Sequence, residues 1–502
     1  FNYIFQMVLV LLKRNQLKLV FGVVMKEKLH LVLTLIKYII MIRIFKHYIP
    51  KSILFLALIE CAMLYLVIWL ALALRFEQIG DQAPGFDDYT AEKLFYVVIV
   101  YLVLLATGLY RLDTCRDIKI STVRLSVSMI LSFFAISVAL FMFPDIDIWR
   151  SVSVYAISLT FLALITGRVL FLYFVDHESI ESRVIVLGAG KRALRVLESN
   201  DKTTSNVNFI HFIRMGETEN EIEDAIDIND IKNLGEFVEE NACQEIVVAI
   251  EERRGTLPVG DLLACKMDGT YISEAASFIE RQVGVLNLAM FDPSWMIFSD
   301  GFDNSKKVDL FLKRLFDIFA SAILLIISAP LLFITAIAVK LTSKGPVFYR
   351  QERMGLMGRT FDVLKFRSMT QNAEADGVPQ WAQQNDARVT LVGKFIRKTR
   401  IDEIPQIFNV LRGDMSFVGP RPERPYFVEQ LTEKIPMFDK RHTVKPGITG
   451  WAQLNYPYGA SEDDSRRKLE YDLYYIKNYS IFLDLLILVQ TIRVVLWPDG
   501  VR

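Results

Sequence analysis

Two adjacent carboxylates, Asp402 and Glu403, stand in a dense patch of both charges between residues 397 and 421. The basic members of this patch are Arg397, Arg400, Arg412 and Arg421. Neighbouring residues on a helix point about 100° apart, so the two carboxylates suit two distinct tasks. Carboxylates with Mg²⁺ and several basic groups are what a phosphoryl transfer requires, and an aspartate can accept the phosphoryl group covalently. The spacing alone leaves a second interpretation open, a surface cluster of salt bridges.

The segment that carries the carboxylates has the pattern of a short helix. Its apolar residues recur at helical spacing and predict one packed face, made of Ile401, Ile404, Ile407, Phe408 and Leu411. Pro405 fits only within the first turn of such a helix, and Gly413 is typical of its end. We therefore expect Asp402 and Glu403 at the helix N-terminus, where free backbone amides stabilise anions.

The composition of the 502-residue chain indicates a membrane component. Its hydrophobic content of 52% and mean hydropathy of +0.32 are high for a purely soluble protein. Lys+Arg and Asp+Glu balance at 57 each, so no global basic field indicates a nucleic acid as a partner. The cysteines lie far apart without a metal-ligand spacing, which is typical of ordinary thiols in a reducing compartment: Cys61, Cys115, Cys243 and Cys265.

Four apolar runs are long enough to cross roughly 30 Å of hydrocarbon. They lie near residues 52–74, 94–110, 122–143 and 152–174. The loop after the first run carries five acids against two bases, whereas the loop after the second carries four bases against two acids. By the positive-inside rule, the second loop and everything after residue 175 face the cytoplasm. Met41 is the expected natural start, because a short basic leader and a clean apolar run follow it.

Glu60 and Arg168 are two of the charged residues that fall inside these runs. Glu60 in the first run is open to two interpretations, a functional group or a paired residue that faces the helical bundle. Arg168 lies near the cytoplasmic end of the fourth run, from which its long side chain can extend to the interface.

A glycine-rich turn follows the membrane segment. The stretch ESRVIVLGAGKRALRVLESN predicts a buried strand, a turn and an amphipathic helix, with Gly188, Gly190 and Ala193 at the G-x-G-x-x-A spacing that lets a phosphate approach the backbone. Further strands at VNFIHFI and EIVVAI predict a Rossmann-like α/β domain up to about residue 290. The ribose-binding acid expected after the second strand is missing, since Arg214 and Met215 stand there. A regulatory or assembly role is therefore preferred over NAD binding.

Two other classes of function remain open at this stage. A membrane-anchored nucleotide-sugar dehydratase or epimerase needs a Tyr-x-x-x-Lys pair after the glycines, whereas the chain has this spacing only at Tyr89 and Lys93, before them. An inactive scaffold of polysaccharide assembly is the other alternative, and the unbroken charged motifs disfavour it.

A further apolar run, from Leu315 to Val339, is also long enough to span a membrane. Basic residues flank both of its ends, and a single crossing cannot place both flanks in the cytoplasm. Pro330 can kink the helix and turn it back, while Ser328 can satisfy a backbone group that the kink frees. The pattern therefore predicts a re-entrant helix over 315–340 that seats the following domain in the inner leaflet.

Four motifs follow this run in close succession: GPVFYRQERMG, FDVLKFRSM, RIDEIPQIFNVLRGDMSFVGPRP and VKPGITGWAQ. With them, the chain resembles the long form of the bacterial polyprenyl-phosphate sugar-1-phosphate transferases from Met41 onward. That resemblance implies a transfer of sugar-1-phosphate from a UDP-sugar to undecaprenyl phosphate, with release of UMP, at the start of exopolysaccharide or related glycan synthesis. It implies a bacterial inner membrane location, an active site facing the cytoplasm, and contact with membrane lipids.

The resemblance also implies a role for individual residues. Asp402 would be the nucleophile that forms an aspartyl sugar-phosphate and a ligand of the required Mg²⁺, and Glu403 would assist the acceptor or the metal. The groups that would bind the phosphates and the nucleotide are Lys365, Arg367, Arg397 and Arg421.

The expected fold combines a membrane α-helical bundle of four spans, a Rossmann-like α/β domain and a mostly α-helical catalytic domain with a re-entrant helix. The expected boundaries are an N-terminal extension 1–40, the bundle 41–175, the α/β domain 176–290, a linker 291–312 and the catalytic domain 313–502. The last apolar run, interrupted by Asp484, Gln490 and Arg493, predicts an interfacial helix. A homodimer joined through the middle domain or the spans is expected.

Overall fold

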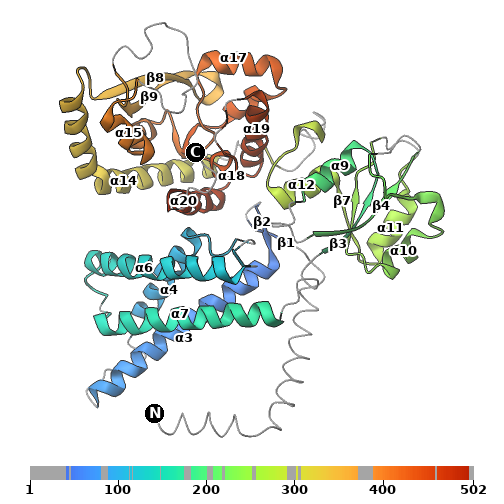
Figure 1. Cartoon of the computed structure of the whole chain (residues 1–502), viewed down its shortest axis with the longest axis horizontal. Coiled ribbons are helices and arrows are strands. Elements are labelled where there is room, and N and C mark those ends of the chain that lie inside the picture. The colour runs from blue at the N-terminus through green and yellow to red at the C-terminus, as the bar shows by residue number, and fades with distance from the viewer. Residues whose placement is uncertain are drawn as a thin grey trace.

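The computed structural model describes residues 41–44, 47–80, 89–111, 114–115, 117–146, 148–174, 182–200, 207–216, 221–251, 256–290, 301–302, 307–370, 388–457, 459 and 461–496. The expected extension 1–40 lies outside this described part. Figure 1 shows three parts in chain order: a bundle of helices in blue and cyan, a sheet covered by helices in green, and a larger part in yellow to red.

The first part is a bundle of long helices preceded by a short antiparallel hairpin. Its elements are β1 (Met41–Ile44), β2 (His47–Pro50), α3 (Lys51–Ile79), α4 (Thr90–Ala106), α6 (Ile118–Met142) and α7 (Arg150–Phe174). Ile68, Val100, Leu104 and Val152 are buried inside the bundle, while many other large apolar side chains lie exposed on its outside. An apolar exterior around an apolar core is typical of helices that face lipid.

Within the described residues, four helices are long and apolar enough to cross a membrane. They are Ile53–Gln78, Ile118–Met142, Arg150–Leu172 and Val308–Thr342. The first three match three of the predicted spans in position, length and apolar composition. The helix at the second predicted span, α4, is as long as the predicted run 94–110, with 17 residues, but it begins four residues earlier and is not among the four.

Glu60 and Arg168 pair with each other in the interior of the bundle. The Nε atom of Arg168 lies 2.8 Å from Oε1 of Glu60, and both side chains are buried. Arg168 also donates to the backbone carbonyl of Leu109 and to the hydroxyl of Ser121. The predicted extension of the Arg168 side chain to the interface is therefore wrong. The side chain stays inside the bundle, because the buried carboxylate of Glu60 is costly unless a cation and further hydrogen bonds compensate its charge.

The second part is a five-stranded parallel sheet in the order β5-β4-β3-β6-β7. Its strands are β3 (Ser182–Leu187), β4 (Val207–Arg214), β5 (Ile226–Asp227), β6 (Glu245–Val248) and β7 (Tyr271–Glu274). Its helices are α9 (Lys191–Glu198), η2 (Ile228–Asp230), α10 (Leu234–Glu240), α11 (Val259–Met267), α12 (Ala275–Val283) and η3 (Leu288–Met290). Alternate residues of β3 enter two separate cores, Val184 and Val186 on one face and Ile185 and Leu187 on the other. The sheet is thus buried on both faces, as parallel sheets generally are.

The third part combines helices with two small two-stranded sheets. Its first elements are α14 (Lys307–Thr342), β8 (Phe348–Met354), η4 (Leu356–Gly358), β9 (Thr360–Phe366), α15 (Leu391–Lys398), η5 (Ile401–Gln406), α16 (Ile407–Arg412) and β10 (Ser416–Val418). The chain continues with α17 (Pro425–Lys434), η6 (Phe438–Thr443), β11 (Gly447–Thr449), α18 (Trp451–Asn455), α19 (Glu462–Lys477) and α20 (Ile481–Leu496). β8 pairs with β9 in antiparallel fashion, and β10 pairs with β11 in parallel fashion.

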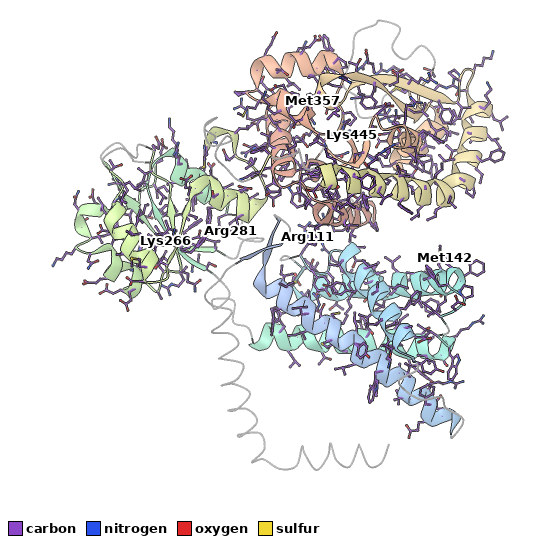
Figure 2. The ribbon with its side chains drawn as sticks, turned by 180° about the vertical axis from the view of Figure 1, so that it is seen from behind. Arg111, Met142, Lys266, Arg281, Met357 and Lys445 are labelled. Atoms are coloured by element: carbon purple, nitrogen blue, oxygen red, sulfur yellow. The ribbon has the colours of Figure 1, made fainter. Side chains whose placement is uncertain are left out.

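Helix α14 starts at Lys307, inside the predicted linker, and runs for 36 residues with Pro330 in its interior. Figure 1 draws it as two limbs that meet at a bend, and Figure 2 shows the same bend from behind. Proline removes a helical hydrogen bond, so a bend within one helix is its expected effect. The hydroxyl of Ser328 is buried without a hydrogen-bond partner among the described residues, so the predicted backbone bond from Ser328 is not found there.

Charged side chains fix the N-terminal limb of α14 to the rest of the third part. Nζ of Lys313 lies 2.6 Å from Oδ2 of Asp484 in α20, and both groups are buried. Asp317 accepts hydrogen bonds from the Ser416 hydroxyl and the Phe417 amide of β10. The C-terminal limb packs on the same part, because Val339 is buried against Phe366, Ile396 and Ile401.

Helix α20 lies between the third part and the bundle, where it contacts both α4 and α18 (Figure 1). Its Asp484 faces Lys313, and its Arg493 is buried beside Gly108 in the turn that follows α4. Asp484 and Arg493, two of the residues whose polarity led to the prediction of an interfacial helix, thus contact other parts of the protein.

Candidate active site

The structure brings Asp402, Glu403, Lys365 and Arg421 together. The two acids lie in the first turn of η5, which continues directly into α16. Lys365 comes from β9, and Arg421 follows β10. The prediction that the carboxylates sit at a helix N-terminus is confirmed, and Gly413 ends α16 with a left-handed φ of 100°.

One oxygen of the Glu403 carboxylate makes short contacts with two cations. Its Oε1 atom lies 3.0 Å from Nζ of Lys365 and 2.8 Å from Nη2 of Arg421. Burial alone would raise the pKa of Glu403, but Arg421 and then Lys365 hold that pKa well below its usual range. Glu403 is therefore a fixed negative charge that orients two basic side chains.

The carboxylate of Asp402 has the opposite character. Its side chain is buried, and its Oδ1 atom has no hydrogen-bond partner among the described residues. Burial, and then the charge of Glu403, raises the pKa of Asp402 to about 6, against the opposing effect of Lys365 and Arg397. One oxygen of Asp402 is thus available to a ligand, and a raised pKa at a buried acid is typical of functional sites.

Two of the arginines singled out in the sequence lie elsewhere. Arg412 is exposed and lies 3.6 Å from Asp414, so it does not belong to the charge cluster around Glu403. Arg367 is buried, and its Nη2 atom donates to the carbonyl and the hydroxyl of Ser343 at the end of α14. Its Nε and Nη1 atoms have no partner among the described residues, so part of this guanidinium is still available.

The predicted apolar face of the same segment is only partly right. Ile401 and Ile407 are buried, as expected, together with Val410. Phe408 is 39% exposed, because the change from a 3-10 helix to an α-helix after Gln406 turns this position away from the core.

The sequence did not single out Asp472, which is connected to the charge cluster through Arg441. Asp472 of α19 is buried and lies 2.8 Å from Nη2 of Arg441. The same Nη2 atom donates to the backbone carbonyl of Arg421. In the sequence Asp472 looks like any other acid of an amphipathic helix, so only the fold reveals its position.

A metal ion in this site would have few protein ligands. Among the described residues, no three His, Cys, Asp or Glu side chains gather in a metal-binding group. The free Oδ1 atom of Asp402 is one oxygen donor. Mg²⁺ is commonly held by one or two carboxylates together with substrate phosphates, and this donor set fits such a mode.

The glycine-rich turn between β3 and α9 forms as the sequence predicted. A side chain of the protein itself, however, occupies the position where this turn would bind an anion. Gly188 has a φ of 128°, and a Cβ atom there would lie 2.6 Å from the Ala249 carbonyl. Gly190 caps α9, and the first amide of that helix, at Lys191, donates to the carboxylate of Glu251 over 2.7 Å. A carboxylate of the chain itself thus stands where the motif would place a phosphate.

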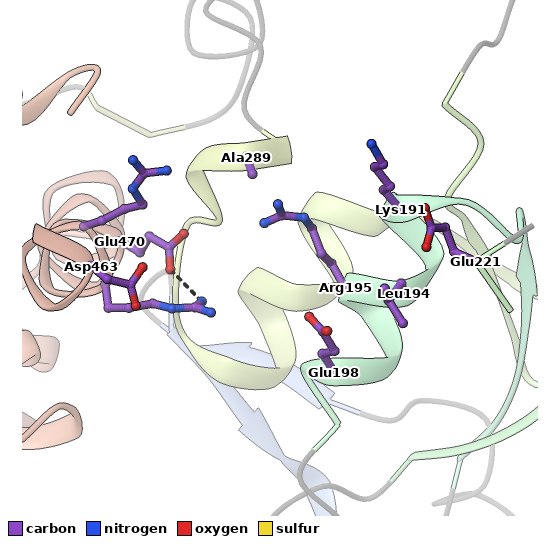
Figure 3. A pocket seen from close by; sticks show the side chains of 10 residues that line it. Lys191, Leu194, Arg195, Glu198, Glu221, Ala289, Asp463 and Glu470 are labelled. Atoms are coloured by element: carbon purple, nitrogen blue, oxygen red, sulfur yellow. Dashed lines mark hydrogen bonds and ion pairs between the residues drawn. The ribbon is translucent and has the colours of Figure 1, made fainter. Parts of the chain in front are cut away.

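Figure 3 shows a second charged region, a cleft of about 450 Å³ between α9 and the start of α19. The charged residues that line this cleft come from the second and the third part of the chain: Lys191, Arg195, Glu198, Glu221, Asp463, Arg466, Arg467 and Glu470. Glu470 pairs with Arg467 across 3.2 Å. Neither Asp402 nor Glu403 lines this cleft.

The Tyr-x-x-x-Lys pair of the dehydratase alternative lies in the helical bundle. Tyr89 precedes α4 and packs on the ring of Phe76, and Lys93 is buried in α4 over the ring of Tyr65. Because this pair is part of the bundle core, it is remote in the fold from the glycine-rich turn (Figure 1).

Fold and site together define a membrane protein with a buried acid and a basic cluster suited to phosphate chemistry. The family described as "Bacterial sugar transferase" matches residues 308–498. A relative named "Exopolysaccharide production protein PSS", from Rhizobium leguminosarum bv. phaseoli, is 40% identical over 194 residues, which are 37% of this chain and 95% of the relative. The chain belongs to the bacterial sugar transferase family.

Two further relatives are longer than the aligned region. A "UDP-N-acetylgalactosamine-undecaprenyl-phosphate N-acetylgalactosaminephosphotransferase" of Aeromonas hydrophila is 53% identical over 192 residues, 38% of this chain and 45% of the relative. A "UDP-glucose:undecaprenyl-phosphate glucose-1-phosphate transferase" of Klebsiella pneumoniae is 49% identical over 187 residues, 37% of this chain and 40% of the relative. The chain thus matches less than half the length of these two relatives.

Proposed function

We propose that the protein transfers a sugar-1-phosphate from a UDP-sugar to undecaprenyl phosphate and releases UMP. The observation that carries this proposal is the contrast between two adjacent acids. Glu403 is held by Lys365 and Arg421, whereas Asp402 keeps an oxygen that is buried without a hydrogen-bond partner among the described residues, under the charge of Lys365 and Arg397. The names of the two longer relatives point to the same reaction class.

The transfer proceeds in two displacements on one phosphorus atom. In the first, a carboxylate oxygen of Asp402 bonds to the sugar-bearing phosphorus, and the bond from that phosphorus to the bridging oxygen breaks and releases UMP. In the second, an oxygen of the lipid phosphate bonds to this phosphorus, and the aspartyl bond breaks. Asp402 thus returns to its starting state, as covalent catalysis requires.

Lys365 and Arg421 spread the negative charge of the diphosphate, and Glu403 keeps both cations oriented toward it. Arg397 favours the charged form of Asp402. Arg367 contacts the end of α14, and its Nε and Nη1 atoms, which have no partner among the described residues, suit a phosphate that enters from the membrane side.

Mg²⁺ is the proposed cofactor, and Asp402 is the residue that would hold it together with the substrate phosphates. Bound there, the ion would neutralise charge on the diphosphate. Chelation with EDTA should then abolish UMP release, and added Mg²⁺ should restore it.

We propose further that α14 is re-entrant and that the site faces the cytoplasm at the inner membrane of a bacterium. Lys313 on the first limb and Val339 on the second both pack on the same C-terminal part, which supports a helix whose two ends lie on one side of the membrane. Basic flanks at both ends agree with that placement. Contact with membrane lipids is proposed because large apolar side chains are exposed on both limbs, among them Phe319, Ile326 and Phe333.

For the middle part we propose a Rossmann-like domain that binds no nucleotide. When its strands are numbered along the chain with β3 as the first, their order across the sheet is 3-2-1-4-5, as in dinucleotide-binding folds. The carboxylate of Glu251 at the start of α9 favours a structural or regulatory role for it. A role in exopolysaccharide synthesis is suggested by the name of the relative that the chain covers almost completely. The homodimer stays a prediction.

The direct test is UMP release by the purified full-length protein in detergent. Wild type should release many UMP molecules per protein from UDP-glucose or UDP-N-acetylgalactosamine when undecaprenyl phosphate is present. Without undecaprenyl phosphate, UMP release should stop after a single turnover. Asp402→Asn should lower the rate by at least about a thousandfold, because the nucleophile is lost. Turnover by this variant at the wild-type rate would refute the proposed role of Asp402.

A further inference from the structure

Arg421 is held at two points. Its Nη2 atom donates to Glu403 over 2.8 Å, and its backbone carbonyl accepts a hydrogen bond of 3.0 Å from Nη2 of Arg441. The first contact orients the guanidinium, and the second fixes the backbone from which the side chain extends. A long arginine side chain loses much conformational freedom when it binds a phosphate, so a fixed backbone reduces what binding costs.

Arg441 owes its own position to Asp472. Nη2 of Arg441 lies 2.8 Å from Oδ2 of Asp472, and both side chains are buried. One nitrogen therefore serves both acceptors, and each of its two hydrogens points to one of them. The planar guanidinium allows no independent adjustment, so the place of the Asp472 carboxylate determines where the Arg421 carbonyl is held.

The ring of Phe438 completes this arrangement. The guanidinium carbon of Arg441 lies 5.0 Å from the centre of that ring, a cation–π contact that fixes the plane of the guanidinium. Among the described residues, no hydrogen bond or ion pair joins Asp472 to Glu403 or Asp402, so any effect on the reaction must pass through Arg441 and Arg421.

We propose that Asp472 is a positioning residue that acts through Arg441 to hold Arg421 against the diphosphate of the UDP-sugar. This role rests on the proposed function. Loss of the Asp472 carboxylate should weaken the binding of the nucleotide diphosphate and leave the handling of the lipid phosphate largely unchanged.

The first measurement is the affinity of the full-length protein for UDP with Mg²⁺, by calorimetry, because it needs no turnover. Asp472→Asn should weaken UDP binding about tenfold, the effect of losing one charge-assisted contact. The matched control is Glu470→Gln, a buried acid two positions away on the same helix whose contacts are with Arg467 and the Leu288 amide. Glu470→Gln should change the affinity less than twofold.

A second variant separates positioning from folding. Asp472→Asn leaves a buried cation unpaired, whereas Asp472→Leu combined with Arg441→Met removes both charges and is compatible with a stable core. The double variant should also bind UDP about tenfold more weakly, because the Arg421 carbonyl has lost its donor. A properly folded double variant with wild-type affinity would overturn the proposal.

The route through Arg421 is tested by a double-mutant cycle. In an Arg421→Ala background, Asp472→Asn should add less than a twofold further loss of UDP affinity. In the turnover assay, Asp472→Asn should raise KM for the UDP-sugar about tenfold and leave KM for undecaprenyl phosphate within twofold. Equal losses for both substrates would indicate a merely structural role and overturn the proposal. If wild type binds UDP but releases no UMP, the proposed reaction fails while the binding cycle still decides the role of Asp472.

Discussion

At the scale of single residues, two adjacent acids differ because their neighbours differ. Glu403 accepts from Lys365 and Arg421, and these cations keep its pKa low. Asp402 has a free oxygen and a pKa raised to about 6 by burial and by Glu403. The division agrees with a nucleophile beside a group that orients the substrate-binding cations.

The pKa of Asp402 predicts an acid limb in the rate profile. A protonated carboxyl group is a poor nucleophile, so kcat/KM for the UDP-sugar should be constant above pH 7 and fall about tenfold per unit below pH 6. Burial also raises the pKa of Asp472 to about 6. The Asp472→Asn variant is therefore the control: its profile should keep the same midpoint, and a lost acid limb would assign the titration to Asp472 instead.

Replacement of Glu403 should move this limb. Because the charge of Glu403 raises the pKa of Asp402, Glu403→Gln should shift the midpoint of kcat/KM to lower pH. The same variant should lower kcat/KM at pH 8 by about a hundredfold, since Lys365 and Arg421 lose the acceptor that orients them. A midpoint that moved to higher pH would show that the two carboxylates are not coupled as described.

The two acids could be predicted from sequence because they are neighbours and because Pro405 and Gly413 delimit the turn around them. The pairing of Asp472 with Arg441 could not be predicted, since the two residues stand 31 positions apart in the sequence. The orientation of Arg367 also depends on its contact with Ser343, 24 positions away, which a local pattern does not contain.

At the scale of elements, α14 is the helix that places the site. Pro330 was recognised as the point of a bend, and the helix nevertheless continues through it from Lys307 to Thr342. The sequence could not reveal why the first limb is fixed, because the partner of Lys313 is Asp484, 171 positions away. A buried ion pair of this kind is costly to break, since the remaining charge is left without compensation.

The Lys313–Asp484 pair should matter for stability. Lys313→Met should lower the free energy of unfolding of the C-terminal part by about 3 kcal/mol, because Asp484 stays buried without its cation. Chemical denaturation in detergent measures this change, followed by the fluorescence of Trp451 in a background whose other five tryptophans are replaced by phenylalanine.

The matched control is Lys340→Met, which alters an exposed lysine at the other end of α14. It should change stability by less than about 0.5 kcal/mol. Equal effects of the two variants would show that the buried pair contributes nothing specific.

At the scale of the whole molecule, the division into bundle, parallel α/β sheet and helical C-terminal part was visible in the composition and periodicity of the chain. The contacts between these parts were not. Glu280 of α12 and Lys477 of α19, 197 positions apart, form a buried ion pair of 2.6 Å, and Nε1 of Trp451 donates to the Gly284 carbonyl. The first contact joins the middle part to α19, the helix that also carries Asp472, and the second joins it to α18.

Glu280→Gln should therefore loosen the docking of the middle sheet. Lys477 would be left buried without its carboxylate, and hydrogen exchange in α12 and α19 should become at least tenfold faster. Glu239→Gln, at an exposed position of α10, is the control and should leave exchange unchanged. Unchanged exchange in Glu280→Gln would mean that other contacts suffice to hold the two parts together.

The central claim is that Asp402 carries the sugar phosphate between the two substrates. Full-length protein incubated with a radiolabelled UDP-sugar and Mg²⁺, without undecaprenyl phosphate, should gain one sugar-phosphate, detected by intact mass and by label retained after denaturation. Asp402→Asn should gain none, and added undecaprenyl phosphate should discharge the wild-type adduct. Equal labelling of Asp402→Asn and wild type, or wild-type turnover without any adduct, would contradict the account.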